Sequence, residues 1–313
     1  MTHSTAIERP FHLPVLLHES ISFLQPKNDG RYVDGTLGAG GHAAGILAAS
    51  QPNGQLLAMD LDEQAIKIAK NELSQFGSRA IIVEASYATL ADQLRKIEWP
   101  CVNGILLDLG LSSMQLDAAE RGFSFTKDAP LDMRFNIEQD LSAAKIVNTF
   151  SETEIEDILK KYGEEPHSRH IAAAIINNRP IDTTYQLANV ILAANKGKRG
   201  KIHPATRTFQ ALRIAVNNEL EVLSNGLFEA LTSLCKSGRL AVISFHSLED
   251  RIVKQFLKYE SRDCVCPPEQ PVCTCSHKAS IKIITKKAVI PSQNEVGMNP
   301  RARSAKLRVA EKI

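Results

Sequence analysis

The feature that most constrains the fold is a glycine-rich stretch at residues 33–42, with the sequence VDGTLGAGGH. A short apolar run precedes it at residues 31–33, and residues 43–50 have the composition of a helix. A strand, a glycine loop and a helix in this order place backbone amides and a helix N-terminus against a bound nucleotide. Glycine is needed because a side chain would hold the backbone away from the ligand. The stretch therefore predicts a nucleotide-binding α/β fold.

A second apolar run supports this prediction. The run that starts at Gln55 is apolar from residue 56 to residue 59 and leads to Asp60, where a carboxylate can accept hydrogen bonds from ribose hydroxyls. Two patterns overlap in the loop: residues 38–43 fit the dinucleotide pattern G-x-G-x-x-A, and residues 34–40 fit the D-x-x-x-G-x-G of S-adenosylmethionine-dependent methyltransferases. The loop alone leaves both cofactors open.

Further apolar runs alternate with helical patterns, at residues 80–84 and 104–107. Nearly continuous apolar strands that alternate with helices indicate a parallel sheet covered on both faces. Asp34, Asp60, Tyr87 and Asp108 each lie at or just after the end of such a run. The carboxyl ends of parallel strands share one edge of the sheet, where ligands bind. We therefore expect these four side chains to converge at that edge.

The pattern changes between residues 116 and 203, which are mostly helical and include a capping-box sequence from Ser151 to Glu154. Alternation resumes with a long predicted helix at 206–223 and a strand at 238–245. Two last strands at 281–285 and 305–309 suit an antiparallel hairpin. We predict a discontinuous core, residues 1–113 and 206–313, around an inserted helical domain at residues 114–205.

Charge is unevenly distributed, although the net charge is only +2. Residues 278–313 hold nine Lys or Arg against two Glu, and residues 117–165 hold twelve acids against six bases. This asymmetry suggests one face suited to polyanions. No apolar run approaches the roughly 20 residues of a membrane span, and residues 1–10 are polar without a signal-peptide core. We therefore expect a cytoplasmic protein with no membrane contact.

Seven segments, which extend from near His12 to near Arg308, resemble the MraW family of ribosomal RNA small subunit methyltransferases. They are residues 33–42, 108–115, 121–125, 131–134, 203–213, 244–251 and 299–304. The resemblance implies methylation of N4 of one cytidine in the decoding region of 16S rRNA, with S-adenosylmethionine as donor and the small ribosomal subunit as partner. It implies a class I, Rossmann-like α/β methyltransferase with a seven-stranded, mostly parallel sheet and an inserted helical domain.

The resemblance also assigns a cofactor site on the expected edge of the sheet. Its members run from the methionine part of the cofactor, through the ribose and the adenosine, to the reacting end: Gly40, Gly41 and His42, then Asp60, then Tyr87, then Asp108 and Gln115. Asp34 is expected to support the loop rather than to touch the cofactor.

The cytosine N4 amine is a poor nucleophile because its lone pair is delocalised into the ring. Acceptors around it would favour a tetrahedral nitrogen as positive charge develops, and Asp108 with the carbonyls of Leu109 and Gly110 are the candidates. DNA amino-methyltransferases have D/N-P-P-Y at this place, whereas this chain has DLGL, so the stacking aromatic is unassigned. Phe123 and Phe125 are candidates for a base clamp or for packing.

His246 follows the predicted strand at 238–245. It is our second catalytic candidate, for contact with the base or for proton transfer. A lone histidine at a strand end is more often a structural hydrogen-bonding residue.

Five arginines are candidates for phosphate contacts, because a guanidinium fork matches phosphate geometry. They are Arg134, Arg207, Arg213, Arg301 and Arg303. Arg213 has Glu219 as an alternative partner on the same predicted helix. In the tail, Arg301, Arg303, Lys306 and Arg308 alternate along what we predict to be a strand, so that one face of it would meet the RNA backbone.

Four of the six cysteines lie close together, as Cys264, Cys266, Cys273 and Cys275. Four thiols framed by prolines could form a tetrahedral zinc site. The C-x-C pairs are less typical of zinc than C-x2-C pairs, so we expect a reduced loop without metal. Disulfides are not expected in a reducing cytosol, and Cys101 and Cys235 are expected to be separate core or near-surface residues.

Two other functions are open to a chain of this pattern. A nicotinamide-dependent oxidoreductase on a Rossmann fold lacks an apparent hydride-transfer constellation here, and a non-catalytic RNA-binding assembly factor leaves the strand-end carboxylates unexplained. The sequence does not fix the oligomeric state, a homodimer included.

Overall fold

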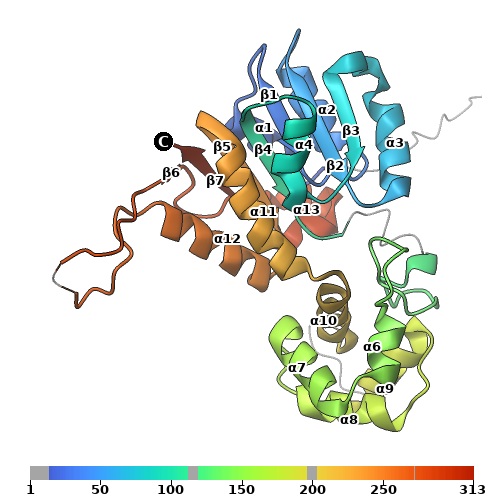
Figure 1. Cartoon of the computed structure of the whole chain (residues 1–313). Coiled ribbons are helices and arrows are strands. Elements are labelled where there is room, and N and C mark those ends of the chain that lie inside the picture. The colour runs from blue at the N-terminus through green and yellow to red at the C-terminus, as the bar shows by residue number, and fades with distance from the viewer. Residues whose placement is uncertain (1–13, 112–118, 196–202, 271) are drawn as a thin grey trace, which may run out of the picture. The chain divides into compact units, whose positions relative to one another are not determined.

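The computed structural model describes residues 14–111, 119–195, 203–270 and 272–313. The chain divides into two compact units, Met1–Gly110 with Gly226–Ile313, and Leu111–Asn225. The first contains the sheet, and the second is helical (Figure 1).

The first unit is built on a seven-stranded sheet in the order β3-β2-β1-β4-β5-β7-β6. Its strands are β1 (Arg31–Asp34), β2 (Gln55–Asp60), β3 (Ala80–Glu84), β4 (Val102–Asp108), β5 (Leu234–Ser244), β6 (Ile281–Ile283) and β7 (Lys306–Lys312). Strands β1 to β5 pair in parallel, whereas β7 is antiparallel to both β5 and β6. The predicted class I sheet and its closing hairpin are confirmed.

Both faces of the sheet are covered, as the continuous apolar strands predicted (Figure 1). The helices that run wholly or partly in this unit are α1 (Leu17–Leu24), α2 (Gly41–Ala49), α3 (Glu63–Leu73), α4 (Leu90–Lys96), α11 (Glu219–Ser233), α12 (Ser247–Glu260) and α13 (Gln293–Met298). On one face α1, α2 and α3 pack Leu24, Ile46 and Leu73 into a core with the strand residues Leu106 and Ile243. Helices α4, α11 and α12 lie on the other side of the sheet (Figure 1).

The start of β5 corrects two expectations. The strand begins at Leu234, before the start expected at residue 238, and its register with β4 shifts between the pairs Val102–Leu234 and Gly104–Arg239. Cys101 and Cys235 flank the first of these pairs, with Cα atoms 5.0 Å apart, and form a disulfide. The expectation that they are separate residues is therefore wrong, because strand pairing brings them within disulfide range.

The second unit packs its helices around its own apolar core. They are α6 (Ala143–Thr149), α7 (Glu152–Gly163), α8 (Ser168–Asn177), α9 (Thr184–Ala194) and α10 (Ala205–Asn217). Ile155, Ile171, Leu187 and Leu212 from four of them are fully buried. The predicted capping box at the start of α7 is present, since Ser151 and the Glu154 side chain each bond the other's backbone N–H.

The long helix predicted at 206–223 is two helices. Asn218 has a φ of 50° and ends α10 before α11 begins. Helix α10 packs on α6, α7 and α9, so it belongs with the helical unit, although the sequence placed it in the core. No helix in the described parts of the chain is long and apolar enough to span a bilayer.

Candidate functional site

The loop between β1 and α2 is fastened to both neighbouring strands. The Gly35 amide donates to the Leu106 carbonyl of β4, and the Leu37 amide donates to the Met59 carbonyl of β2, each at 2.9 Å. The amide of Asp108 donates in turn to the Thr36 hydroxyl at 2.6 Å. The loop is therefore held at the carboxyl edge of the sheet before any ligand binds.

Gly40 ends this loop at the N-terminus of α2. Its φ of 89° lies in the left-handed region, where a side chain is strained, so the sharp entry into the helix requires glycine. Gly41 and His42 form the first turn of α2. The three residues assigned to the methionine part of the cofactor thus lie at a helix N-terminus, whose dipole suits a carboxylate.

Asp60 ends β2 and also holds the loop. Its Oδ2 accepts the Gly38 amide at 2.8 Å, and its Oδ1 accepts the Asp62 amide at 2.9 Å. The Leu61 amide also bonds this carboxylate, which has about four acceptor sites in all. Asp60 therefore keeps acceptor capacity for a hydroxyl, the group that a ribose presents.

Asp108 ends β4 and lies beside His42. The carboxylate Oδ2 is 3.5 Å from His42 Nδ1, and His42 Nε2 is 3.0 Å from the Val15 carbonyl oxygen. The side chain of Asp108 is 20% exposed, yet its Oδ1 is buried and has no hydrogen-bond partner. The Asp108 side chain is thus partly exposed, and its Oδ1 lacks a hydrogen-bond partner.

Asp34 ends β1 and is fully buried. Its Oδ1 accepts the Thr36 amide at 3.2 Å, which confirms its expected support of the loop, while Oδ2 has no partner. Burial raises the pKa of Asp34 to about 7, and the charge of Asp60 adds to this effect. Burial likewise raises the pKa of Asp108 well above its ordinary value, helped by Asp34 and Glu249.

These carboxylates define what the edge can bind. Asp34 and Asp108 are buried acids whose raised pKa values favour the protonated, neutral carboxyl, and each has one oxygen without a hydrogen-bond partner. A cation nearby would lower these pKa values and favour the ionised carboxylates. The residues therefore fit the sulfonium of S-adenosylmethionine, with Asp60 for its ribose.

Tyr87 lies just after β3 and packs on α11. A side chain at Gly226 would meet the Tyr87 ring, because a Cβ there would be 2.3 Å from its Cδ2. The ring is half-buried at the strand end where the sequence expected it. Gln115, the remaining predicted cofactor residue, lies outside the described residues.

His246 caps α12. Its Nδ1 accepts the Glu249 amide at 3.4 Å, and Glu249 Oε2 accepts the Phe245 amide at 2.8 Å and the His246 amide at 3.3 Å. This reciprocal arrangement is a capping box, with histidine in the place of the usual serine or threonine. His246 therefore has the structural hydrogen-bonding role that was the alternative to a catalytic one.

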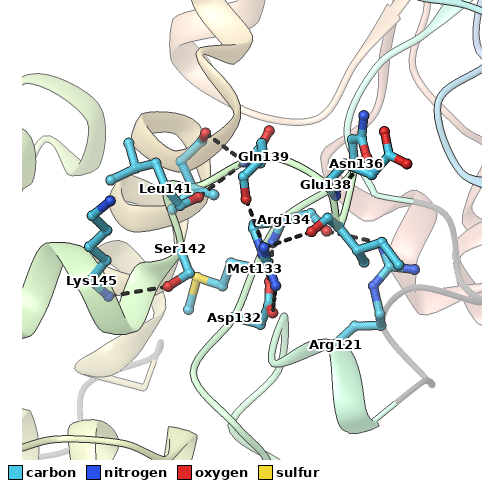
Figure 2. Close-up of polar contacts among 12 residues, drawn as sticks. Arg121, Asp132, Met133, Arg134, Asn136, Glu138, Gln139, Leu141, Ser142 and Lys145 are labelled. Carbon is cyan, nitrogen blue, oxygen red and sulfur yellow. Dashed lines mark hydrogen bonds and ion pairs between the residues drawn. The ribbon is translucent and has the colours of Figure 1, made fainter.

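Arg134 is held inside the helical unit (Figure 2). Its Nε and Nη2 donate to the two oxygens of Asp132, each at 2.8 Å, and Nη1 donates to the carbonyls of Ile137 and Gln139 at 2.7 Å. Burial pushes the pKa of Asp132 up, but the Arg134 guanidinium outweighs this and holds it below the ordinary value. The guanidinium fork expected for a phosphate is occupied by the protein's own acceptors.

Arg213 is also paired, as its alternative predicted. Its Nε and Nη2 donate to the two carboxylate oxygens of Glu219 at 2.7 and 2.8 Å, and the side chains are only 13% and 10% exposed. Arg207, Arg301 and Arg303 are exposed and therefore accessible to a phosphate. The strand expected to carry the last two begins later, because both lie in a 3-10 helix, Pro300–Ser304.

The aromatic candidates are packing residues. Phe123 is buried in the core of the helical unit, and the Phe125 ring packs against Phe209 and His203, with centroids 4.9 and 4.7 Å apart. Sequence reasoning missed Thr36, which binds the Asp108 amide, and Glu249, which affects the Asp108 carboxyl. Their signals were the position of Thr36 inside the glycine loop and the spacing of Glu249 three residues after His246.

The sheet order, the fastened glycine loop and the strand-end acids define a class I methyltransferase. A family model described as the MraW methylase family matches residues 9–313, so the chain belongs to the MraW methylase family. This membership sets aside the oxidoreductase and the non-catalytic alternative, and S-adenosylmethionine is the cofactor.

Relatives are similar to this chain over most of their own length. One from Dehalococcoides mccartyi, named ribosomal RNA small subunit methyltransferase H, is 55% identical over 96% of this chain and 86% of its own. One of the same name from Syntrophus aciditrophicus is 51% identical over 97% and 98%. A solved structure of a putative rRNA methylase from Clostridium thermocellum, 12% identical, covers 97% of this chain and 100% of its own with a TM-score of 0.46.

Proposed function

We propose that this protein methylates the N4 amine of one cytidine in the decoding region of 16S rRNA. Two relatives at 51% and 55% identity carry the name of a small-subunit rRNA methyltransferase, which supports the RNA substrate. The observation that carries the chemistry is the carboxyl edge of the sheet, where the Asp108 side chain lies beside His42, is 20% exposed and has one unpartnered oxygen, Oδ1.

When bound, the cofactor supplies an electrophilic methyl group on a sulfonium. Residues of this chain bind and orient it: the first turn of α2 faces the methionine carboxylate, and Asp60 accepts the ribose hydroxyls. Asp108, ionised when a cation is close, suits the sulfonium. Holding the acceptor nitrogen in line with the methyl and the sulfur supplies much of the rate acceleration in such a transfer.

Asp108 has a second role toward the acceptor. Its carboxylate, with the carbonyls of Leu109 and Gly110, accepts hydrogen bonds from the cytosine amine as that nitrogen becomes positively charged. Gly110 has a φ of 95°, which turns the chain sharply after β4. We assign His246 to holding α12 at the end of β5, and we assign phosphate contacts to the exposed Arg207, Arg301 and Arg303.

Two measurements test the proposal. Calorimetry should show binding of S-adenosylmethionine and no binding of NAD. Transfer of a tritiated methyl group should label purified small subunits or their 16S rRNA at a single cytidine, as N4-methylcytidine after digestion to nucleosides. Label on another base, or on another nitrogen of cytosine, would overturn the assigned substrate while leaving the methyltransferase intact.

The comparison of assembled small subunits with naked 16S rRNA decides which is the substrate. A target base must be unstacked to reach a methyl donor, and loops present such bases most readily. We expect the particle that displays the decoding region to be the better acceptor, in the cytoplasm where it is assembled.

A further inference from the structure

Four thiols gather in the segment between α12 and β6. Cys264, Cys266, Cys273 and Cys275 each direct a sulfur into one cluster, and all four sulfurs lie within 4.8 Å of one another. Cys275 Sγ is 3.6 Å from Cys273 Sγ and 3.9 Å from Cys264 Sγ. The segment that carries them extends away from the sheet as a long excursion (Figure 1).

These separations match a tetrahedral metal site. Zinc–sulfur bonds of about 2.3 Å place the sulfurs of a tetrahedron about 3.8 Å apart. The two measured separations lie on either side of that value. A disulfide would need about 2.05 Å between sulfurs, so the cluster is not two disulfides.

The described residues of this segment form no buried apolar core. Every described residue from 261 to 280 is exposed or half-buried; of its two valines, Val265 is half-buried and Val272 is 69% exposed. Thiols are weak hydrogen-bonding groups, so they do not hold an exposed loop by themselves. Small segments without a core depend on a metal or another crosslink.

The surroundings of the sulfurs agree with this interpretation. The Val265 amide points at Cys275 Sγ at 3.5 Å, and backbone N–H groups directed at metal-bound thiolates orient the ligands. The base of the segment is closed independently, since the Ser280 amide donates to the Glu260 carbonyl at 2.8 Å. The cluster is therefore a separate closure of the loop tip.

We propose that Cys264, Cys266, Cys273 and Cys275 bind one zinc ion as a tetrahedral tetrathiolate that holds this loop. The spacing of the cysteines favoured a metal-free loop, and the three-dimensional clustering of all four sulfurs reverses that preference. The ion is structural, because four protein ligands leave no open position for a substrate. The site does not depend on the methyl-transfer proposal.

The full chain, produced without a metal-binding tag and purified in reductant, tests the site. Elemental analysis should find one zinc per chain, and Cys266→Ser and Cys273→Ser should each lose it. Thr274→Ala, a change between two of the ligands, should keep it. Replacement of zinc by cobalt should give the visible absorption bands of a tetrahedral cobalt thiolate.

A second readout works on the wild-type protein and needs no variant. Removal of zinc with a chelator should speed tryptic cleavage after Arg262 and Lys278 at least about tenfold, while the sheet signal in circular dichroism stays unchanged, since local openings govern such cleavage. A reduced protein that takes up neither zinc nor cobalt would overturn the proposal. So would disulfides among the four cysteines in protein alkylated at lysis, and iron in place of zinc would overturn the choice of metal.

Discussion

His42 Nδ1 lies 3.5 Å from Asp108 Oδ2, while Nε2 of the same ring lies 3.0 Å from the Val15 carbonyl oxygen. A carbonyl only accepts, so the network assigns a proton to Nε2. In the neutral ring Nδ1 then has a lone pair toward Asp108 Oδ2. Burial raises the pKa of Asp108, and a protonated Asp108 carboxyl can donate to that lone pair.

This arrangement predicts how Asp108 recognises the cofactor. Asp108→Asn should lower the affinity for S-adenosylmethionine by about 10- to 100-fold, the loss expected when a charged hydrogen-bonding partner is removed. S-adenosylhomocysteine lacks the sulfonium charge, so its affinity should fall by less than about threefold in the same variant. Calorimetry with both ligands measures the difference.

Asp60→Asn is the matched control. Asp60 is assigned to the ribose, which both ligands share, so this change should weaken the two about equally. Equal losses for Asp108→Asn as well would refute the assignment of Asp108 to the sulfonium.

The raised pKa of Asp34 predicts a pH dependence of stability. Between its ordinary value of 3.8 and about 7, the folded chain holds a proton at Asp34 that the unfolded chain releases. Asp34 therefore lowers the free energy of unfolding as the pH rises through this range, by at most about 4 kcal/mol at about 1.4 kcal/mol per pH unit. Urea unfolding of the wild type and Asp34→Asn at about pH 5 and pH 8 should show the wild type losing stability relative to the variant.

Asp250 should change the stability with pH in the opposite direction to Asp34. Burial acts to raise its pKa, but Arg308 and Lys306, at 2.7 and 2.9 Å, outweigh this and lower it. Asp250→Asn should therefore reduce stability at neutral pH, and the loss should shrink as the pH falls below the ordinary value of 3.8. For Asp34, the contradicting result would be a free energy of unfolding that changes equally with pH in the wild type and in Asp34→Asn. Asp34 would then not be protonated in the folded chain.

Arg213 and Arg207 should differ in their roles, because Arg213 is paired within the fold and Arg207 is exposed. Arg213→Gln removes the positive charge that pairs with Glu219, whose side chain is only 10% exposed. A nearly buried carboxylate without this ion pair should lower the free energy of unfolding by about 3 kcal/mol. Arg207→Gln removes an exposed cation and should change stability by less than about 0.5 kcal/mol. It should instead weaken RNA binding and lower the slope of log affinity against log salt by about one.

Thermal unfolding and filter binding at several salt concentrations measure the two effects. The double variant Arg213→Gln with Glu219→Gln should recover part of the lost stability, because no buried charge remains. An unchanged salt slope for Arg207→Gln would remove Arg207 from the RNA-binding surface.

The sequence predicted features that depend on local pattern. The apolar runs that end in Asp34, Asp60 and Asp108 are strands that do end at those residues, because burial on both faces of a parallel sheet shows in each run separately. The class of fold followed from these runs and the glycine loop.

Features that depend on distant pairing were not predictable in this way. The Cys101–Cys235 disulfide joins residues 134 apart in sequence, through a strand register that no local pattern shows. Arg134 looks the same in sequence whether it binds a phosphate or Asp132. The break at Asn218 was visible in principle, because asparagine is a common residue in the left-handed position that ends a helix.

His246 offers the last test, because its capping role and a catalytic role predict different rescues. Asparagine is a good helix N-cap and has no titratable ring. His246→Ala should lower stability by about 1 kcal/mol, and His246→Asn should restore it. If His246 acts only by holding the start of α12, His246→Asn should also restore methyl transfer, with the same pH profile as the wild type. Restored stability with methyl transfer still lost would assign the imidazole to the chemistry instead. We expect the first result, since the Glu249 side chain and the His246 ring already use each other's backbone amides at this helix end.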